Sequence, residues 1–278
     1  MMETKTNPIK KVIAVHDLSG LGRCSLSAAF PILSVMGNQV CPLPTAILSA
    51  QTDGFEGFTF HDMTGELVPY FDYLLANSAA FHAFYSGFLG SASQIEKVEY
   101  MISRLSPDTM VLVDPVMGDR GKLYSTHDGS MVEGMRTLCC RSDIITPNIT
   151  EAFFLLDEKP EERYDGERVS SLVRRLVKMT GARVVITGIE LDGKIASAFS
   201  EDGCEVCFTY NPHLKKHYPG TGDIFASVLL GRLLQGLSFG ESAESASGFV
   251  YSVMKYSMDF DYPSREGVLL EAKLGELA

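Results

Sequence analysis

Short apolar runs alternate along this chain with longer segments of helical periodicity. The clearest run is MVLV at 110–113, an uninterrupted apolar stretch that ends abruptly at Asp114-Pro115. Such alternation is typical of parallel strands joined by crossover helices, with helices on both faces of the sheet. The other expected strands are at 11–15, 39–43, 80–88, 143–146 and 183–187, and the strongest helical patterns are at 24–37, 65–77, 93–105, 166–181, 224–236 and 239–257.

Two hairpin turns late in the chain depart from this pattern. Asp192-Gly193 and Asp202-Gly203 separate strand-like segments at 184–187, 194–200 and 204–210, and Asp-Gly is a favoured hairpin turn. We therefore expect an α/β fold, a three-layer sandwich with a mainly parallel central sheet and an antiparallel edge. No linker, repeat or low-complexity segment interrupts the 278 residues, which predicts a single domain spanning 1–278.

Composition narrows the class of partner. The net charge is −11 and no basic cluster occurs, which argues against nucleic acid as a ligand. No apolar run is long enough to span a membrane, and the N-terminal run is too short for a signal peptide. Six cysteines in a chain without a secretory signal indicate reduced thiols. We expect a cytoplasmic protein that binds small molecules.

Polar and small residues gather directly after several of the apolar runs. Ligands of parallel α/β sheets bind outside the carboxyl ends of the strands, so these residues are candidates for one site. Each also has a plainer explanation, because Asp-Pro and Pro-Asn are common turns and Glu151 suits the first turn of a helix. The candidates are Asp17 and Ser19, Ser86-Gly87-Phe88, Asp114 and Asp119, Asn148 and Glu151, and Thr187-Gly188.

The motif Gly220-Thr221-Gly222-Asp223 opens the apolar helix at 224–236. Glycines let several backbone N–H groups point at one spot, and the helix adds its positive end, which together suit a phosphate. Asp223 is then either a helix N-cap or a general base for an attacking hydroxyl. Asp114, Asp119 and Glu151 offer the oxygen ligands that Mg²⁺ prefers. This combination favours a phosphotransferase, and no Walker-type or complete dinucleotide-binding motif competes with it.

Five segments carry a resemblance to a known family. They are LPTAILSAQTDG at 43–54, YSGFLGS at 85–91, DPVMGDRGKLY at 114–124, TPNITEA at 146–152 and PGTGDIFAS at 219–227. With these in order, nearly the whole chain resembles the ribokinase superfamily and, within it, the pyridoxal kinases. The resemblance implies an ATP-dependent kinase that phosphorylates the 5′-hydroxymethyl group of a B6 vitamer (pyridoxal, pyridoxamine or pyridoxine), with Mg²⁺, K⁺ as a further cation, and a homodimeric assembly.

The resemblance also implies a role for each candidate residue. Asp223 would be the general base, with Gly220, Thr221 and Gly222 as the anion hole. Asp114, Asp119 and Glu151 would organise Mg²⁺. The nucleotide and its cations would involve Asp114, Thr146, Asn148, Glu151, Thr187, Gly188 and Thr221. The vitamer would lie near His16, Asp17, Ser19, Ala46, Ser49, Thr52, Phe88 and Asp223.

The segment HDLSGLG at 16–22 keeps a second substrate open. It is similar to the Asp-x-Ser-Gly turn of hydroxymethylpyrimidine kinases, whereas pyridoxal kinases of this type carry Ser at the position of His16 and Tyr at that of Phe88. A hydroxymethylpyrimidine kinase is therefore the alternative enzyme. A sugar or nucleoside kinase of the same superfamily is a further one, but we expect little room here for its larger lid of extra strands. A vitamer-binding or nucleotide-binding regulator without turnover is the alternative from another class.

Overall fold

The computed structural model describes residues 7–78, 80–125 and 127–278. Nine strands form one sheet in the order β11-β10-β9-β8-β5-β4-β1-β2-β3, and β6 and β7 form a separate small hairpin. The strands are β1 (Lys10–Leu21), β2 (Asn38–Ala50), β3 (Phe60–Asp62), β4 (Ala83–Ser86), β5 (Met110–Val113), β6 (Gly118–Asp119), β7 (Lys122–Leu123), β8 (Ile144–Ile145), β9 (Arg183–Leu191), β10 (Lys194–Ser200) and β11 (Cys207–Pro212).

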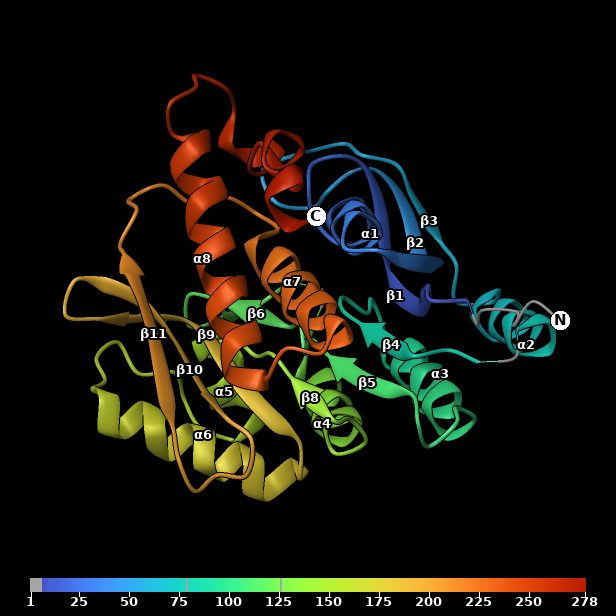
Figure 1. The fold of residues 1–278 in the computed structure, drawn as a ribbon, viewed down its shortest axis with the longest axis horizontal. Coiled ribbons are helices and arrows are strands. Elements are labelled where there is room, and N and C mark those ends of the chain that lie inside the picture. The colour runs from blue at the N-terminus through green and yellow to red at the C-terminus, as the bar shows by residue number, and fades with distance from the viewer. Residues whose placement is uncertain (1–6, 79, 126) are drawn as a thin grey trace, which may run out of the picture.

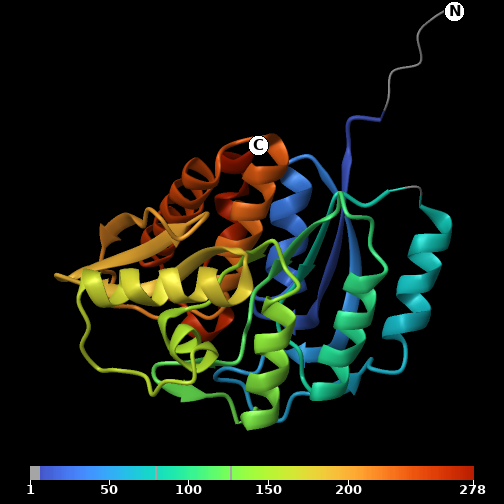
Figure 2. The same ribbon diagram turned by 90° about the horizontal axis from the view of Figure 1, so that it is seen from below.

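Helices cover both faces of this sheet (Figures 1 and 2). Helices α2 to α6 pack on one face, and α1, α7 and α8 pack on the other together with the short 3₁₀ turns at the C-terminus. The helices are α1 (Leu26–Val35), α2 (Leu67–Asn77), α3 (Ala92–Ser103), α4 (Gly129–Cys139), α5 (Ile149–Leu155), α6 (Gly166–Thr180), α7 (Thr221–Gln235) and α8 (Phe239–Ser257).

The central strands are apolar on both sides because each side faces a helical layer. In β1, Ile13 and Val15 belong to the core under α2–α6, whereas Val12 and Ala14 belong to the core under α1, α7 and α8. Strands buried on two faces have continuous apolar runs rather than alternating ones. This is why the central strands could be located in the sequence.

The mainly parallel sheet is confirmed, and so is the antiparallel edge at β9–β10–β11. The antiparallel strand β3 at the opposite edge was not expected. The prediction that β1 ends near residue 15 was wrong, because the strand continues to Leu21. After an irregularity in register between His16 and Leu18, residues 18–21 pair with residues 47–50 of β2.

We call this extension, residues 18–21 and 47–50, the β-arm. Asp17 and Ser19 therefore lie within a strand rather than in a turn after it. The β-arm lacks a helical layer over one face, since Leu18 is 39% exposed and its register partner Ile47 is 43% exposed, whereas Ser19 and Leu48 on the other face are buried. Its sequence consequently has no continuous apolar run, which is why it was not predicted as strand.

Two further expectations bear on the environment of the protein. All six cysteines are free in the structure. Among the residues that the structure describes, no helix is both long and apolar enough to cross a lipid bilayer.

Candidate active site

The site is built around the start of α7. Gly220 is the N-cap residue and has a left-handed backbone with φ of 84°. A Cβ atom at Gly220 would lie 2.0 Å from the carbonyl oxygen of Arg23, so only glycine allows the loop before α1 to lie this close. The first N–H groups of α7 have no partner within the helix, and they and the positive helix end form a site for an anion.

Asp223 is the third residue of α7 and not its N-cap, so the simpler explanation of this acid as a helix cap was wrong. Its side chain is 12% exposed. Burial raises the pKa of Asp223 to about 7, the negative charge of Asp17 adds to the rise, and a hydrogen bond from the Ser25 backbone opposes it. A carboxyl group whose pKa lies near neutrality is suited to accept a proton at physiological pH.

The end of β1 and the loop after it supply the next groups. Asp17 is buried, and its Oδ2 accepts a hydrogen bond of 3.0 Å from the hydroxyl of Ser19. Burial raises the pKa of Asp17. Burial also raises the pKa of the Cys24 thiol, and the charges of Asp223 and Asp17 act on it in the same direction. Cys24 and Ser25 thus lie beside the two acids, although no motif in the sequence indicated them.

Asp114 lies directly after β5 and is also buried. The Thr146 hydroxyl donates a 3.1 Å hydrogen bond to its Oδ1. Burial raises the pKa of Asp114 well above its usual range, and the negative charges of Glu151 and Asp223 add to this effect. The ends of β5 and β8 and the start of α7 therefore meet at one edge of the sheet, as the sequence predicted.

Glu151 has a structural role as well as a predicted chemical one. It forms a capping box with Asn148 at the start of α5. Its carboxylate accepts hydrogen bonds from the backbone N–H groups of Asn148 at 2.8 Å and of Met117 at 3.0 Å. Burial nevertheless raises the pKa of Glu151 to about 8. The plainer explanation of Glu151 as a first-turn acid of a helix is confirmed, and the same cap holds its buried carboxyl next to Asp114.

The predicted magnesium ligands are not assembled as a complete site. Asp119 is 42% exposed and lies 3.8 Å from the Arg120 guanidinium. Within the described ranges, no three His, Cys, Asp or Glu side chains are placed to hold a metal ion. The donor set still fits Mg²⁺, which is usually bound through one or two carboxylates with water and phosphate oxygens completing its shell. A cation beside Asp114 and Glu151 would also relieve their mutual repulsion.

Thr187 and Gly188 lie within β9, next to Asn148, because this strand continues to Leu191 rather than ending near residue 187 as expected. Thr187 forms a bridge with Asn148, and its N–H donates a 2.9 Å hydrogen bond to the carbonyl of Pro147. Gly188 has a left-handed backbone with φ of 67°. The structure thus groups these residues with Asn148, Glu151 and the Asp114–Thr146 pair.

The predicted vitamer contacts are only partly brought together. His16 is fully buried, and its Nδ1 lies 3.9 Å from Oδ1 of Asp223. Ala46 is buried in β2, and the half-buried Phe88 has its ring 5.5 Å from that of His127. Ser49 and Thr52 are exposed, and the Ser49 hydroxyl accepts a hydrogen bond from the N–H of Thr59. These two have no contact with Asp223 in the structure comparable to that of His16.

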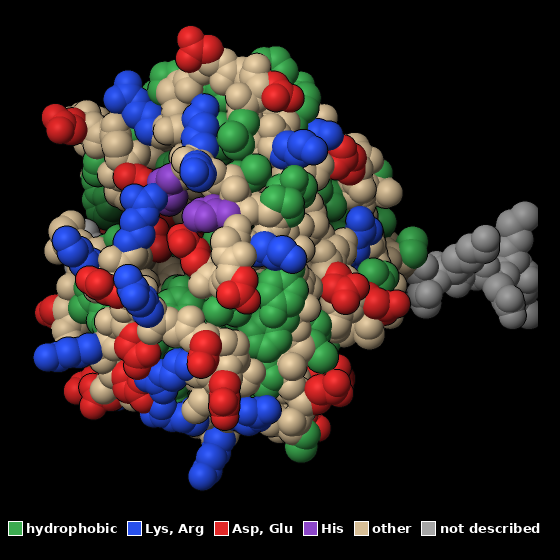
Figure 3. All heavy atoms as spheres, turned by 90° about the vertical axis from the view of Figure 1, so that its left-hand side faces the viewer, with side chains coloured by type: hydrophobic (Ala, Val, Ile, Leu, Met, Phe, Trp, Pro, Cys, Tyr) green, Lys and Arg blue, Asp and Glu red, His purple; other side chains and the backbone are tan. Residues whose placement is uncertain are grey.

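The carboxyl ends of β4 and β5 point towards the left-hand face of Figure 1. On that face, acidic side chains lie at a hollow, and histidine, lysine and arginine side chains lie beside it (Figure 3). The hollow is consistent with a site that binds an anionic ligand next to carboxylates.

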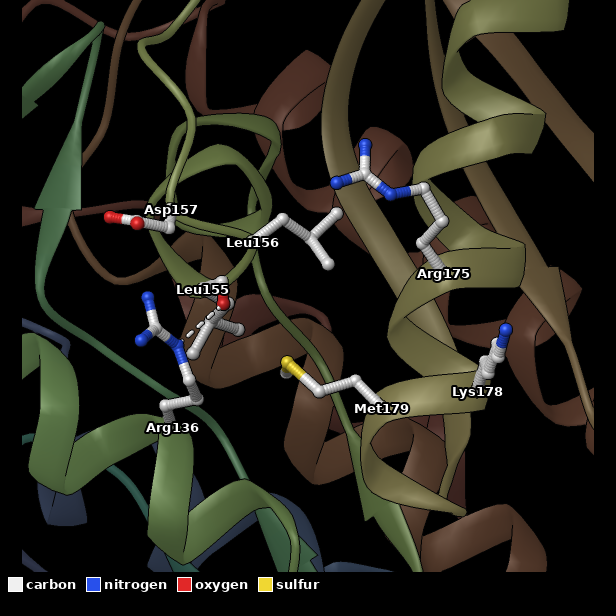
Figure 4. A pocket seen from close by; sticks show the side chains of 7 residues that line it. All are labelled: Arg136, Leu155, Leu156, Asp157, Arg175, Lys178 and Met179. Atoms are coloured by element: carbon white, nitrogen blue, oxygen red, sulfur yellow. Dashed lines mark hydrogen bonds between the residues drawn. The ribbon is translucent and has the colours of Figure 1, made fainter.

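Away from these residues, a pocket of about 540 Å³ lies between α4, α5 and α6 (Figure 4). It is at the carboxyl end of α5, whereas Glu151 is at the other end of that helix. Arg136, which lines the cavity, donates a 2.8 Å hydrogen bond to the carbonyl of Leu155 and so caps α5. The lining contains none of the predicted site residues.

Residues 26–266 match the protein family described as phosphomethylpyrimidine kinase. The chain belongs to this family. The pyridoxal kinase of Arabidopsis thaliana is 30% identical to this chain over 215 residues, which cover 74% of this chain and 68% of that protein. The resemblance to pyridoxal kinases is thereby confirmed.

Two solved structures have the same fold. One is a protein of Bacteroides thetaiotaomicron VPI-5482, described as a candidate phosphomethylpyrimidine kinase, in a crystal form with pyridoxal. It is 40% identical, has a TM-score of 0.91, and the match covers 97% of this chain and 96% of that one. The other, pyridoxal kinase from Lactobacillus plantarum, is 28% identical with a TM-score of 0.90 and covers 96% of both chains. The expected ribokinase-like fold is confirmed.

Proposed function

We propose that this protein is an ATP-dependent kinase that phosphorylates the 5′-hydroxymethyl group of a B6 vitamer, pyridoxal, pyridoxamine or pyridoxine. One observation carries the proposal: Asp223, whose side chain is only 12% exposed and whose pKa burial raises to about 7, lies in the first turn of α7 beside the N–H groups that open this helix. The similarity to proteins named pyridoxal kinase and to a structure with pyridoxal supports the choice of acceptor.

In the proposed reaction, Asp223 accepts the proton of the acceptor hydroxyl as its oxygen attacks the γ-phosphorus of ATP. A new O–P bond forms, the bond between the γ-phosphorus and the bridging oxygen breaks, and ADP leaves. The first N–H groups of α7, at Thr221 and Gly222, stabilise the charge on the transferring phosphoryl group. Gly220 permits the tight turn that aims them.

Asp114 and Glu151 are the residues that would hold Mg²⁺, with Asp119 contributing through water. The ion, when bound, neutralises charge on the phosphates of ATP. Thr146, Thr187 and Thr221 offer hydroxyl groups to the nucleotide or to K⁺, and Asn148 and Gly188 lie beside Thr187. Asp114 would act on both Mg²⁺ and the nucleotide. The hydrogen bond that the Thr146 hydroxyl donates to its carboxylate holds Asp114 beside Thr146.

For the vitamer we propose a position between the β-arm and Phe88. Phe88 and Ala46 provide apolar surface for an aromatic ring. Asp17, Ser19, Ser49 and Thr52 offer polar groups along β2 and the end of β1. We further propose that residues 1–278 act as one kinase domain, of which residues 1–6, 79 and 126 lie outside the described part, and that the enzyme is a cytoplasmic homodimer.

A hydroxymethylpyrimidine is the second acceptor to consider, because the matching family is described as phosphomethylpyrimidine kinase. Both acceptors present a hydroxymethyl group on an aromatic heterocycle, so Asp223 and the anion site would act in the same way on either.

The test is ADP release from ATP and Mg²⁺ with a panel of acceptors. The panel contains pyridoxal, pyridoxamine, pyridoxine, hydroxymethylpyrimidine, ribose and a blank without acceptor, and Asp223→Asn serves as the inactive control. Release with a B6 vitamer well above the pyrimidine supports the proposal. Release with the pyrimidine alone would assign the second function, and ATP binding without release on any acceptor would favour a regulator.

A further inference from the structure

The imidazole of His16 is an unusual feature of the site. It is fully buried, and neither ring nitrogen has a hydrogen-bond partner among the described residues. A buried polar group without a partner destabilises the folded state, because it has lost its hydrogen bonds to water and gained none in the protein. Such groups are rare in native proteins, and one next to reactive residues points to a ligand that completes its hydrogen bonds.

The position of Nδ1 indicates where that ligand atom lies. Nδ1 is 3.9 Å from Oδ1 of Asp223, which is too long for a direct hydrogen bond. This separation matches one oxygen atom about 2.8 Å from each of the two atoms, with an angle of about 90° at that oxygen. The two side chains are therefore spaced to share one oxygen atom.

Two neighbours fix the ring in this orientation. A Cβ atom at residue 87 would lie 2.2 Å from Nδ1 of His16, so Gly87 provides the room that the imidazole fills. The ring of Tyr85 packs edge-on against it, with the centroids 4.2 Å apart. Burial also lowers the pKa of His16 to about 3, so the ring is uncharged and carries one N–H.

We propose that His16 is a catalytic residue that donates a hydrogen bond from Nδ1–H to the oxygen of the acceptor hydroxyl, opposite Asp223. This inference rests on the proposed function and assigns His16 to the reacting hydroxymethyl group rather than to the ring of the vitamer. As Asp223 takes the proton, negative charge develops on the oxygen, and the hydrogen bond from His16 strengthens before the bond to phosphorus forms. Nε2 then carries only a lone pair.

The first test combines a protein change with a ligand change. His16→Phe keeps a flat ring and removes the donor, and a vitamer analogue without the 5′-hydroxyl removes the acceptor. We expect His16→Phe to lower kcat about 10²-fold and to weaken binding of the hydroxylated vitamer several-fold, with unchanged affinity for the deoxy analogue and for ATP. His82→Phe, which alters an exposed histidine before β4, is the matched control and should retain kcat.

Two outcomes would overturn the assignment. One is a folded His16→Phe enzyme whose kcat is within about twofold of wild type. The other is equal weakening of the hydroxylated vitamer and the deoxy analogue, which would indicate a general packing role.

A second test uses the unaltered protein, in case His16→Phe does not fold. In ¹⁵N-histidine NMR we expect Nδ1 of His16 to carry the proton and to shift when the hydroxylated vitamer binds, but not with the deoxy analogue. An Nδ1 without a proton in the complex would refute the role. Turnover by the wild-type enzyme tests the proposed function alone, so the two can fail separately.

Discussion

Replacing the proposed base should remove activity and make the protein more stable. In Asp223→Asn the amide cannot accept a proton, and a general base contributes about 10²–10⁴-fold to the rate. The same change removes a carboxylate whose ionisation the fold opposes. The gain in stability should therefore grow as pH rises above about 4, where the unfolded chain loses this proton, and should be complete above about 7.

The size of the gain follows from the pKa. Burial raises it from 3.8 to about 7, a difference of about 3 units or about 4 kcal/mol. Because the folded state binds this proton more tightly, the free energy of unfolding falls as pH rises from about 4 to about 7 and changes little above that. Solvent reaches the side chain, which is 12% exposed, so we expect about half, or about 2 kcal/mol. In a chain of this length that is about 4 °C in Tm.

The assay is thermal unfolding of wild type and Asp223→Asn at pH 4.5 and at pH 8, without ATP and with a chelator present. We expect similar Tm values at pH 4.5 and a higher Tm for the variant at pH 8. Asp108→Asn, at an exposed turn after α3, is the control and should shift Tm at neither pH. If the difference in Tm between Asp223→Asn and wild type were absent at pH 8, or equally large at pH 4.5, the idea of a charge buried at Asp223 would be refuted.

Further predictions concern the helix start and the metal. Gly220→Ala should lower Tm and abolish activity because its Cβ meets the Arg23 carbonyl, whereas Gly222→Ala, whose Cβ meets nothing within 4 Å, should leave Tm unchanged. Glu151→Gln and Glu241→Gln both replace the acid of a capping box by the amide that the same motif also uses, so both variants should fold. Only Glu151→Gln should raise, about tenfold, the Mg²⁺ concentration for half-maximal activity; an equal effect of Glu241→Gln would exclude Glu151 from the metal site. With Asp223 as the base, kcat/KM should rise tenfold per pH unit below about 7 and level off above it; a rate independent of pH from 5 to 8 would argue against this base.

How far the sequence could predict the fold depended on the burial of each segment. The run at 110–113 is buried from both sides in β5, so its pattern was unambiguous. Segment 18–21 of β1 follows the same strand, but it lies in the β-arm, where one face is open and small polar residues replace the apolar run. Local sequence pattern therefore located the strands that lie under helices, and it missed the β-arm, which extends beyond the helical layer.

The candidate site was predictable for a different reason. Asp114, Glu151 and Asp223 belong to segments whose strand and helix ends must meet at one edge of a parallel sheet, and the structure brings them close enough for their charges to raise the pKa of Asp114. His16 is different, because its importance depends on Gly87 and Asp223, which lie far from it in sequence. Nothing near His16 in the chain indicates that both ring nitrogens are buried without partners.

The loop at residues 22–25, between β1 and α1, is positioned by contacts with residues far away in the sequence. A local sequence pattern cannot reveal such contacts. The Arg23 carbonyl lies against Gly220, and two residues later the Ser25 backbone donates to Asp223. Arg23 is itself held from the other end of the chain, where its guanidinium donates to the Glu266 carbonyl at 2.9 Å and to the Glu271 carboxylate at 2.8 Å. Because these partners are more than 240 residues away in sequence, no motif could contain them. The C-terminal turns therefore help to fix the loop that closes over the start of α7, although they contribute no group to the proposed reaction.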